Sequence, residues 1–212
     1  MAYQRTAAVI ARLEDNRARI LAAARDLVAE GGWQRAHVAT VAAKAGLATG
    51  TVYRYFPSKA ELFAEVLANV SRRERDVVAA IVDGEGSPAA RLKGAVAAFA
   101  KRALRGRRLA YALIAEPCDP EIDRARLQWR AALGEEFVRL ITLGQEAGAF
   151  RGSDARITAS CVVGAVMEAL VGPLTPEVIE DDTAAERFIA EITEACLAIV
   201  TRLPARGIGR IG

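Results

Sequence analysis

The sequence has little of what catalytic and metal sites need. Its 212 residues include one histidine, His37, and three widely separated cysteines, Cys118, Cys161 and Cys196. A single histidine with no evident partners supplies neither a metal site nor the base of a catalytic triad. The cysteines lack metal-ligand spacing, which favours reduced structural thiols. We therefore expect no metal, no cofactor and no catalytic residue, and an enzyme is the least favoured class.

Long apolar runs are also missing. Charged residues interrupt the apolar runs well short of the ~20 residues that a membrane span needs. The first 19 residues contain no continuous apolar segment of the kind found in signal peptides. Hydrophobic residues nevertheless make up 52% of the chain, enough for a substantial core. These features predict a globular cytoplasmic protein with no membrane partner.

Strand patterns are absent as well. Apolar residues recur at spacings of three and four, which is typical of amphipathic helices, and no convincing alternating segment occurs. Glycines and prolines divide the sequence into about nine helices, so the predicted fold class is all-α. We expect these helices at residues 16–30 with a possible earlier start, 38–45, 49–55, from the Ser58–Glu61 capping box to about 82, 89–104, 107–115, 119–147, 154–172 and 182–203.

Charge is distributed unevenly along the chain. The net charge is only +3, but residues 1–59 carry nine basic and four acidic residues, a net charge of +5. The remaining residues carry 20 basic and 22 acidic residues. A polyanion would be attracted to the N-terminal segment. Arg5 and Arg12 form either an arm along such a partner or, as the sequence favours, an ordinary solvated helix face.

The segment 38–59 is the most informative part of the sequence. It predicts two short helices joined by a turn, in which Gly46 stops the first helix in a left-handed conformation. Pro57 prevents continuation of the second helix. Val52 and Phe56 are four residues apart and face the core, which leaves polar side chains on the other faces. Two helices joined in this way, the second exposed and polar, are the geometry of a DNA-binding helix-turn-helix.

These residues also match a known family. The runs Val41-Ala-Ala-Lys-Ala-Gly46 and Gly50-Thr-Val-Tyr-Arg-Tyr-Phe-Pro-Ser-Lys59 resemble the tetracycline-repressor (TetR) family of bacterial transcriptional regulators, with a close match over about residues 16–67. The resemblance implies an all-helical homodimer. A three-helix DNA-binding domain would occupy residues 1–60. A larger helical domain, residues 61–212, would bind an effector and dimerise through the last two long helices.

Two positions depart from the family pattern. Helix caps of the family are usually Ser or Thr, whereas His37 and Ala48 stand at these two positions. A missing cap costs about 1 kcal/mol. Thr49 either caps the second helix one residue later or is free to touch DNA. His37 either contacts a phosphate beside the positive end of its helix or is an ordinary surface histidine.

The exposed face of the second short helix supplies the predicted DNA contacts. Arg54, near its middle, either reads a guanine edge or contacts phosphate. Tyr53 and Tyr55 occupy positions that contact the DNA backbone in the family, and their hydroxyls are able to reach phosphates. A cation in the first turn of the next helix opposes the helix dipole, which favours a phosphate role for Lys59. The predicted set is His37, Thr49, Thr51, Tyr53, Arg54, Tyr55 and Lys59.

The C-terminal part carries no catalytic signature and is interpreted as the effector-binding part. Aromatic and methionine side chains at helical spacing form either an apolar cavity or solid core. The basic run at 101–108 is a solvated face or, less favoured, the mouth of a site for an anionic ligand such as an acyl-CoA or an organic acid. Gly164 and Ala165 permit close helix approach, which suits a four-helix bundle formed by two chains. The predicted cavity residues are Phe99, Arg102, Tyr111, Trp129, Phe137, Met167 and Glu168.

Together these features predict a ligand-responsive, homodimeric, DNA-binding transcriptional regulator. The favoured mode is repression, relieved when a small apolar or amphipathic effector releases the protein from a palindromic operator. Activation is left open. The competing hypotheses are an architectural DNA-binding protein without an effector and an enzyme that uses the C-terminal cavity. The expected partners are double-stranded operator DNA, a second copy of the chain and the effector.

Overall fold

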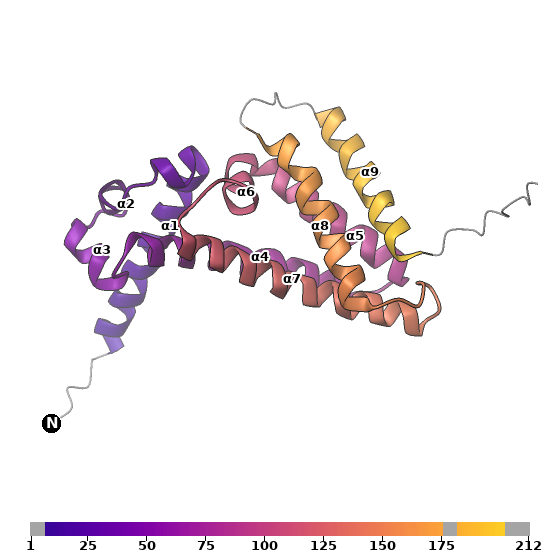
Figure 1. Ribbon diagram of the computed structural model, residues 1–212. Coiled ribbons are helices and arrows are strands. Elements are labelled where there is room, and N and C mark those ends of the chain that lie inside the picture. Colours follow the sequence, from indigo (N-terminus) through magenta and orange to yellow (C-terminus); the bar gives the residue numbers. More distant parts are fainter. Residues whose placement is uncertain (1–6, 176–181, 202–212) are drawn as a thin grey trace, which may run out of the picture. The chain divides into compact units, whose positions relative to one another are not determined.

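The computed structural model describes residues 7–175 and 182–201, and every regular element within these ranges is a helix (Figure 1). The predicted all-α class is thereby confirmed. The helices are α1 (Ala7–Arg35), α2 (Val38–Lys44), α3 (Thr49–Tyr55), α4 (Lys59–Val82), α5 (Pro88–Arg105), α6 (Arg107–Ile114), α7 (Pro120–Glu146), α8 (Ala155–Leu174) and α9 (Asp182–Val200).

The predicted helix bounds agree closely with these, with one notable difference in α1. The helix begins at Ala7, nine residues before the predicted minimum, because no breaker interrupts the earlier residues. Gly32 interrupts its geometry with φ 73°, close to the predicted helix end at residue 30, but helical structure resumes and continues to Arg35. Arg5 and the predicted end of the last helix at residue 203 lie outside the described residues.

The chain divides into two compact units, and each is considered by itself. The first comprises Met1–Arg72, Gly106–Trp129 and Leu174–Pro176, and the second comprises the remainder. Helices α4 and α7 contribute to both units. The first unit therefore includes α6 in addition to the helix-turn-helix. The functional boundary between residues 60 and 61 stays a prediction.

The core of the first unit forms around one stripe of α1. Ile20, Ala24 and Val28 recur every four residues and are completely buried, as the apolar spacing predicted. Phe63 of α4 is also completely buried, and its ring meets that of Trp33 edge to face, with the centroids 5.7 Å apart. This packing supports α2 and α3, which lie beside α1 in Figure 1.

The second unit is a helical bundle in which α5 packs against α9. Val96 of α5 and Cys196 of α9 are fully buried. Leu140 of α7 and Val162 of α8 are also fully buried and belong to the core of the same unit. Among the described helices, α8 is also long and apolar enough to cross a membrane by length and composition alone. Core helices of soluble proteins share these properties, and 44% of its apolar window is buried.

Candidate nucleic-acid interface and effector cavity

The turn between α2 and α3 is closed by backbone hydrogen bonds around Gly46. Gly46 has φ 65°, a left-handed conformation that favours glycine. Its N–H donates to the carbonyl of Ala43 at 3.1 Å, and the N–H of Leu47 donates to the carbonyl of Ala42 at 2.9 Å. This pair of bonds is the Schellman arrangement. The predicted role of Gly46 as the stop of the first short helix is confirmed.

Neither short helix has a side-chain cap among the described residues. His37 and Ala48 occupy the N-cap positions of α2 and α3, and neither side chain caps its helix. Thr49 is the first residue inside α3, so the alternative in which Thr49 becomes the cap is not the one adopted. Its exposed hydroxyl therefore remains available to an outside partner.

The buried and exposed faces of α3 divide as the apolar spacing predicted. Val52 and Phe56 are buried, with exposed fractions of 1% and 4%, and hold the helix onto the unit. Thr49 and Arg54 are exposed, and Tyr53 keeps 46% of its surface in solvent. The unit thus presents a polar helix face whose residues serve no core function.

Gly50 stands at an open position on this face. A Cβ built at Gly50 would have no described atom within 4 Å, apart from its chain neighbours and its own helix backbone. Its φ also lies outside the left-handed region, so neither packing nor conformation requires glycine there. Glycine in a helix interior destabilises a protein by roughly 0.5–1 kcal/mol relative to alanine. Nothing in the described part of the chain accounts for a glycine at this position.

Of the remaining predicted DNA residues, Tyr55 and Lys59 also contact other side chains of the fold. Thr51, Tyr55 and Lys59 are half-buried, and His37 is exposed. The Tyr55 hydroxyl accepts a hydrogen bond from Asn16 Nδ2 at 3.3 Å. Lys59 Nζ lies 5.8 Å from the centroid of the Phe63 ring. The Ser58 hydroxyl caps α4 by accepting from the N–H of Glu61 at 3.0 Å, which is half of the predicted capping box.

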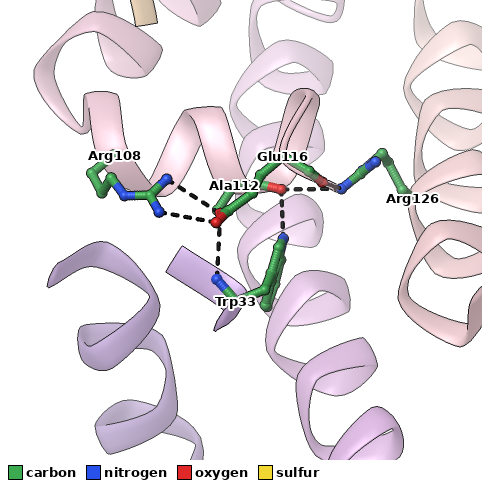
Figure 2. Close-up of polar contacts among 5 residues, drawn as sticks. All are labelled: Trp33, Arg108, Ala112, Glu116 and Arg126. Atoms are coloured by element: carbon green, nitrogen blue, oxygen red, sulfur yellow. Dashed lines mark hydrogen bonds and ion pairs between the residues drawn. The ribbon is translucent and has the colours of Figure 1, made fainter. Parts of the chain in front are cut away.

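The structure also reveals a polar cluster in the first unit that the sequence did not suggest. We call Trp33, Arg108, Ala112, Glu116 and Arg126 the Glu116 cluster (Figure 2). The Glu116 carboxylate is almost fully buried and accepts from both Arg108 Nη atoms, at 3.2 and 3.0 Å. It also accepts from the backbone N–H of Trp33 at 3.3 Å. The carboxylate thereby joins the end of α1 to both ends of α6.

Two backbone carbonyls complete the Glu116 cluster. The Trp33 indole N–H donates to the carbonyl of Ala112 at 2.7 Å. Arg126 Nη2, from α7, donates to the same carbonyl at 3.2 Å and to the carbonyl of Glu116 at 2.7 Å. The two Arg126 bonds are charge-assisted and buried, which makes them stronger than hydrogen bonds between neutral groups in water. The cluster thus ties three helices of the first unit together (Figure 2).

Gly32 makes room for the Glu116 cluster. A Cβ at this position would overlap Arg108 Nη2 and both carboxylate oxygens of Glu116. The φ of 73° is in the left-handed region, so glycine is required for conformation as well as for space. The sequence predicted that the first helix ends at residue 30, directly before Gly31 and Gly32. Glu116, the partner of Gly32 in this fit, lies 84 positions along the chain and carried no local signal.

The second unit contains a small apolar cavity. It is lined by α5, α7 and α8 through Val96, Phe99, Leu133, Phe137, Val163, Val166 and Met167. Its volume is about 10 Å³, close to the minimum for a single water molecule. An organic ligand therefore requires these helices to separate or side chains to move.

The predicted cavity residues are dispersed. Three of them, Phe99, Phe137 and Met167, line the cavity together. Arg102 donates instead to both carboxylate oxygens of Glu74 at 2.8 Å, and this hydrogen bonding raises the pKa of Arg102. The other three do not line it: Tyr111 and Trp129 belong to the first unit, and Glu168 is exposed on α8.

The basic run at 101–108 is partly neutralised within the fold. Arg102 is paired with Glu74, and Arg108 with Glu116. Arg108 also lies over the Tyr111 ring, 5.8 Å from its centroid. These pairings favour the interpretation as a structural and solvated face over that of an anionic ligand's mouth. In the described part of the chain, no group of three or more His, Cys, Asp or Glu residues is arranged to hold a metal ion.

Comparisons with known proteins agree with this architecture along most of the chain. Residues 20–66 match the family model described as bacterial regulatory proteins of the tetR family. Residues 85–188 match the model described as a tetracyclin repressor-like C-terminal domain. The chain is 42% identical over 60 residues to the HTH-type transcriptional repressor KstR of Rhodococcus jostii strain RHA1. That match spans only 28% of either chain.

Solved structures resemble the chain over most of its length. The fatty acid degradation regulator FadR from Bacillus halodurans superposes with a TM-score of 0.75 at 20% identity, covering 92% of this chain and 97% of that one. The regulator FadR from Bacillus subtilis, in complex with stearoyl-CoA, superposes with a TM-score of 0.74 at 17% identity, covering 86% and 98%. At these identities the likeness shows a shared fold.

Proposed function

Because this chain belongs to the tetracycline-repressor (TetR) family of bacterial regulatory proteins, we propose that it is a ligand-responsive, homodimeric transcriptional repressor. The observation that carries the proposal is the polar face of α3. It is exposed at Thr49, Tyr53 and Arg54 and left open at Gly50. Such a face suits the major groove, where Arg54 would meet a guanine edge and the tyrosine hydroxyls would meet phosphates.

The proposed dimer places two such faces on one palindromic operator. Two recognition helices entering successive major grooves are about 34–36 Å apart. The exposed stripe of α8 supports dimerisation, since Ile157 is 66% exposed while Cys161 and Gly164 lie in solvent. A Cβ at Gly164 would meet no described atom outside its own helix. Small residues of this kind allow a partner helix to approach closely.

The proposed effector is apolar or amphipathic because the cavity lining is apolar. Phe99, Phe137 and Met167 would form its walls once α5, α7 and α8 separate. An effector that binds only the separated arrangement shifts the population toward it. If that arrangement spaces the two DNA-binding faces differently, operator affinity falls. The protein would act in the cytoplasm and need no catalytic residue.

DNA binding is tested by fluorescence anisotropy with fragments from the region upstream of the protein's own gene. The logarithm of the affinity should fall linearly with the logarithm of salt concentration, because each phosphate contact releases counterions. The variant Arg54→Ala should weaken binding to the preferred fragment more than to unrelated DNA. Absence of binding to any upstream fragment, or binding insensitive to salt, would refute the proposal.

A second candidate function is favoured by one observation. The cavity lined by α5, α7 and α8 has a volume of only about 10 Å³, too small for an organic ligand, as expected for an architectural DNA-binding protein without an effector. The two functions differ in their response to ligand. Stearoyl-CoA and simpler apolar compounds should release the operator if the protein is ligand-responsive. Indifference to the whole panel would favour the architectural function.

A further inference from the structure

The first turns of α1 form an extension that precedes residues 20–66, the segment that matches the family model. The family match begins at residue 20, whereas α1 begins at Ala7. We call residues 7–19 the α1 extension. From residue 8 to residue 19 it is exposed except at Leu13 and Asn16, which are half-buried. It thus contributes little to the core and leaves its function to be explained.

Three side chains hold the α1 extension against the helix-turn-helix. Asn16 Nδ2 donates to the Tyr55 hydroxyl at the end of α3. Arg17 lies 5.2 Å from the Phe56 ring centroid and also pairs with a carboxylate of α4. Arg19 Nη2 donates to the carbonyl of Ala45, at the end of α2, at 2.6 Å. The extension is therefore fixed beside the C-terminal ends of both α2 and α3.

Arg12 lies on the face of the α1 extension that the Asn16 and Arg19 contacts define, whereas Arg17 is about 140° away around the helix. At 3.6 residues per turn, positions 16 and 19 lie about 40° and 20° to either side of position 12, so the three positions span about 60° around the helix. Arg12 is exposed and forms no hydrogen bond or ion pair with any described residue. With a rise of 1.5 Å per residue, it lies roughly 6 Å beyond Asn16 along the axis. In Figure 1 this end of α1 projects past α3.

The charges around Arg12 do not cancel it. Glu14 is about 200° away, on the far side of the helix. Asp15 is engaged by Arg19, with the nearest charged atoms 3.8 Å apart. A guanidinium without a partner among the described residues thus stands about one helical turn beyond the Asn16–Tyr55 contact. An ordinary solvated face, which the sequence favoured for Arg12, explains the exposure but not why three neighbouring residues anchor this helix to α2 and α3.

We propose that Arg12 contacts a DNA phosphate next to the one reached from the end of α3, so that the α1 extension widens the footprint of each protomer. This inference rests on the proposed function, because it requires the polar face of α3 to enter the groove. A guanidinium binds phosphate strongly but carries no base information in such a contact. Arg12 therefore adds affinity and salt dependence without adding sequence preference.

The test compares full-length Arg12→Gln with wild type and with Arg151→Gln. Arg151 is an exposed arginine of the second unit, so its substitution changes the net charge equally. Arg12→Gln should reduce the slope of log affinity against log salt by about 0.9 per protomer. The loss should be the same on the preferred fragment and on point variants of it. Arg151→Gln should leave the slope unchanged.

Two outcomes would overturn the inference while leaving the proposed function intact. The first is a slope for Arg12→Gln equal to that of wild type and of Arg151→Gln. The second is a loss confined to particular base pairs, which would mean base reading. Failure of the proposed function looks different, since wild type itself would then lack salt-dependent binding. Arg12 is exposed, so unchanged thermal unfolding of Arg12→Gln serves as the folding control.

Discussion

Replacing Gly32 with alanine should destabilise the first unit strongly. The backbone at φ 73° and ψ −173° is a conformation nearly restricted to glycine, and it costs a residue with a Cβ about 1–3 kcal/mol. The new Cβ would also overlap the Glu116 carboxylate and Arg108, so their hydrogen bonds must break or lengthen. Hydrogen bonds to charged groups contribute about 1.5–3 kcal/mol each. We expect a loss of roughly 3–5 kcal/mol in the free energy of unfolding.

The assay is urea unfolding followed by tryptophan fluorescence. Both tryptophans of the chain, Trp33 and Trp129, belong to the first unit, so the signal reports on that unit. Gly50→Ala is the matched control, because its Cβ meets nothing and its backbone is helical. It should raise stability slightly, by up to about 1 kcal/mol.

A double substitution sharpens this prediction. Glu116→Ala removes the carboxylate that the new Cβ would overlap, at the cost of the cluster's hydrogen bonds. Gly32→Ala should therefore cost much less in the Glu116→Ala background than in wild type, a non-additivity of at least about 1 kcal/mol. The reasoning is refuted if Gly32→Ala alone costs under 1 kcal/mol, or if the two substitutions add independently.

Three further predictions follow from the same geometry. Gly50→Leu should leave thermal unfolding nearly unchanged but weaken operator binding by on the order of tenfold or more, about 1.4 kcal/mol. An operator affinity equal to that of wild type, measured by anisotropy, would contradict the proposed α3 face. Trp33→Phe should lower the free energy of urea unfolding by about 0.5–1.5 kcal/mol, since Ala112 keeps its bond from Arg126. Burial raises the pKa of Cys196 to about 11, so this thiol stays protonated at pH 8. Iodoacetamide should modify Cys196 only in urea, whereas the exposed Cys161 should react in the native protein. Rapid labelling of Cys196 in the native protein, located by mass spectrometry, would show that this thiol is not buried.

The fold could be predicted from the sequence to the extent that its signals are local. Gly46 stops α2 because the left-handed turn depends on the residue itself and its immediate neighbours. Pro57 and the Ser58 hydroxyl separate α3 from α4 by equally local means. The α3 face was likewise predictable, because the spacing of Val52 and Phe56 fixes which sides remain exposed.

Features that depend on distant residues were not predictable. Glu116 and Arg108 look like ordinary surface charges until folding brings them against Trp33. The cavity shows the same difficulty, since aromatic content suggested Tyr111 and Trp129 equally with Phe99. Pairing in three dimensions, which periodicity alone does not encode, decides which of these side chains meet.

The fit between Gly32 and Glu116 also restricts which substitutions this sequence is able to accumulate during evolution, and in which order. Any side chain at position 32 displaces the carboxylate and the Arg108 guanidinium that it holds, and a smaller residue at position 116 removes part of this steric conflict while the positive φ still favours glycine. Substitutions should therefore be tolerated in one order, position 116 before position 32. Among descendants of this sequence, a non-glycine residue at 32 should accompany the loss of the acid at 116. Position 32 at the end of α1 and position 116 in the loop after α6, 84 positions apart in the sequence, should then covary.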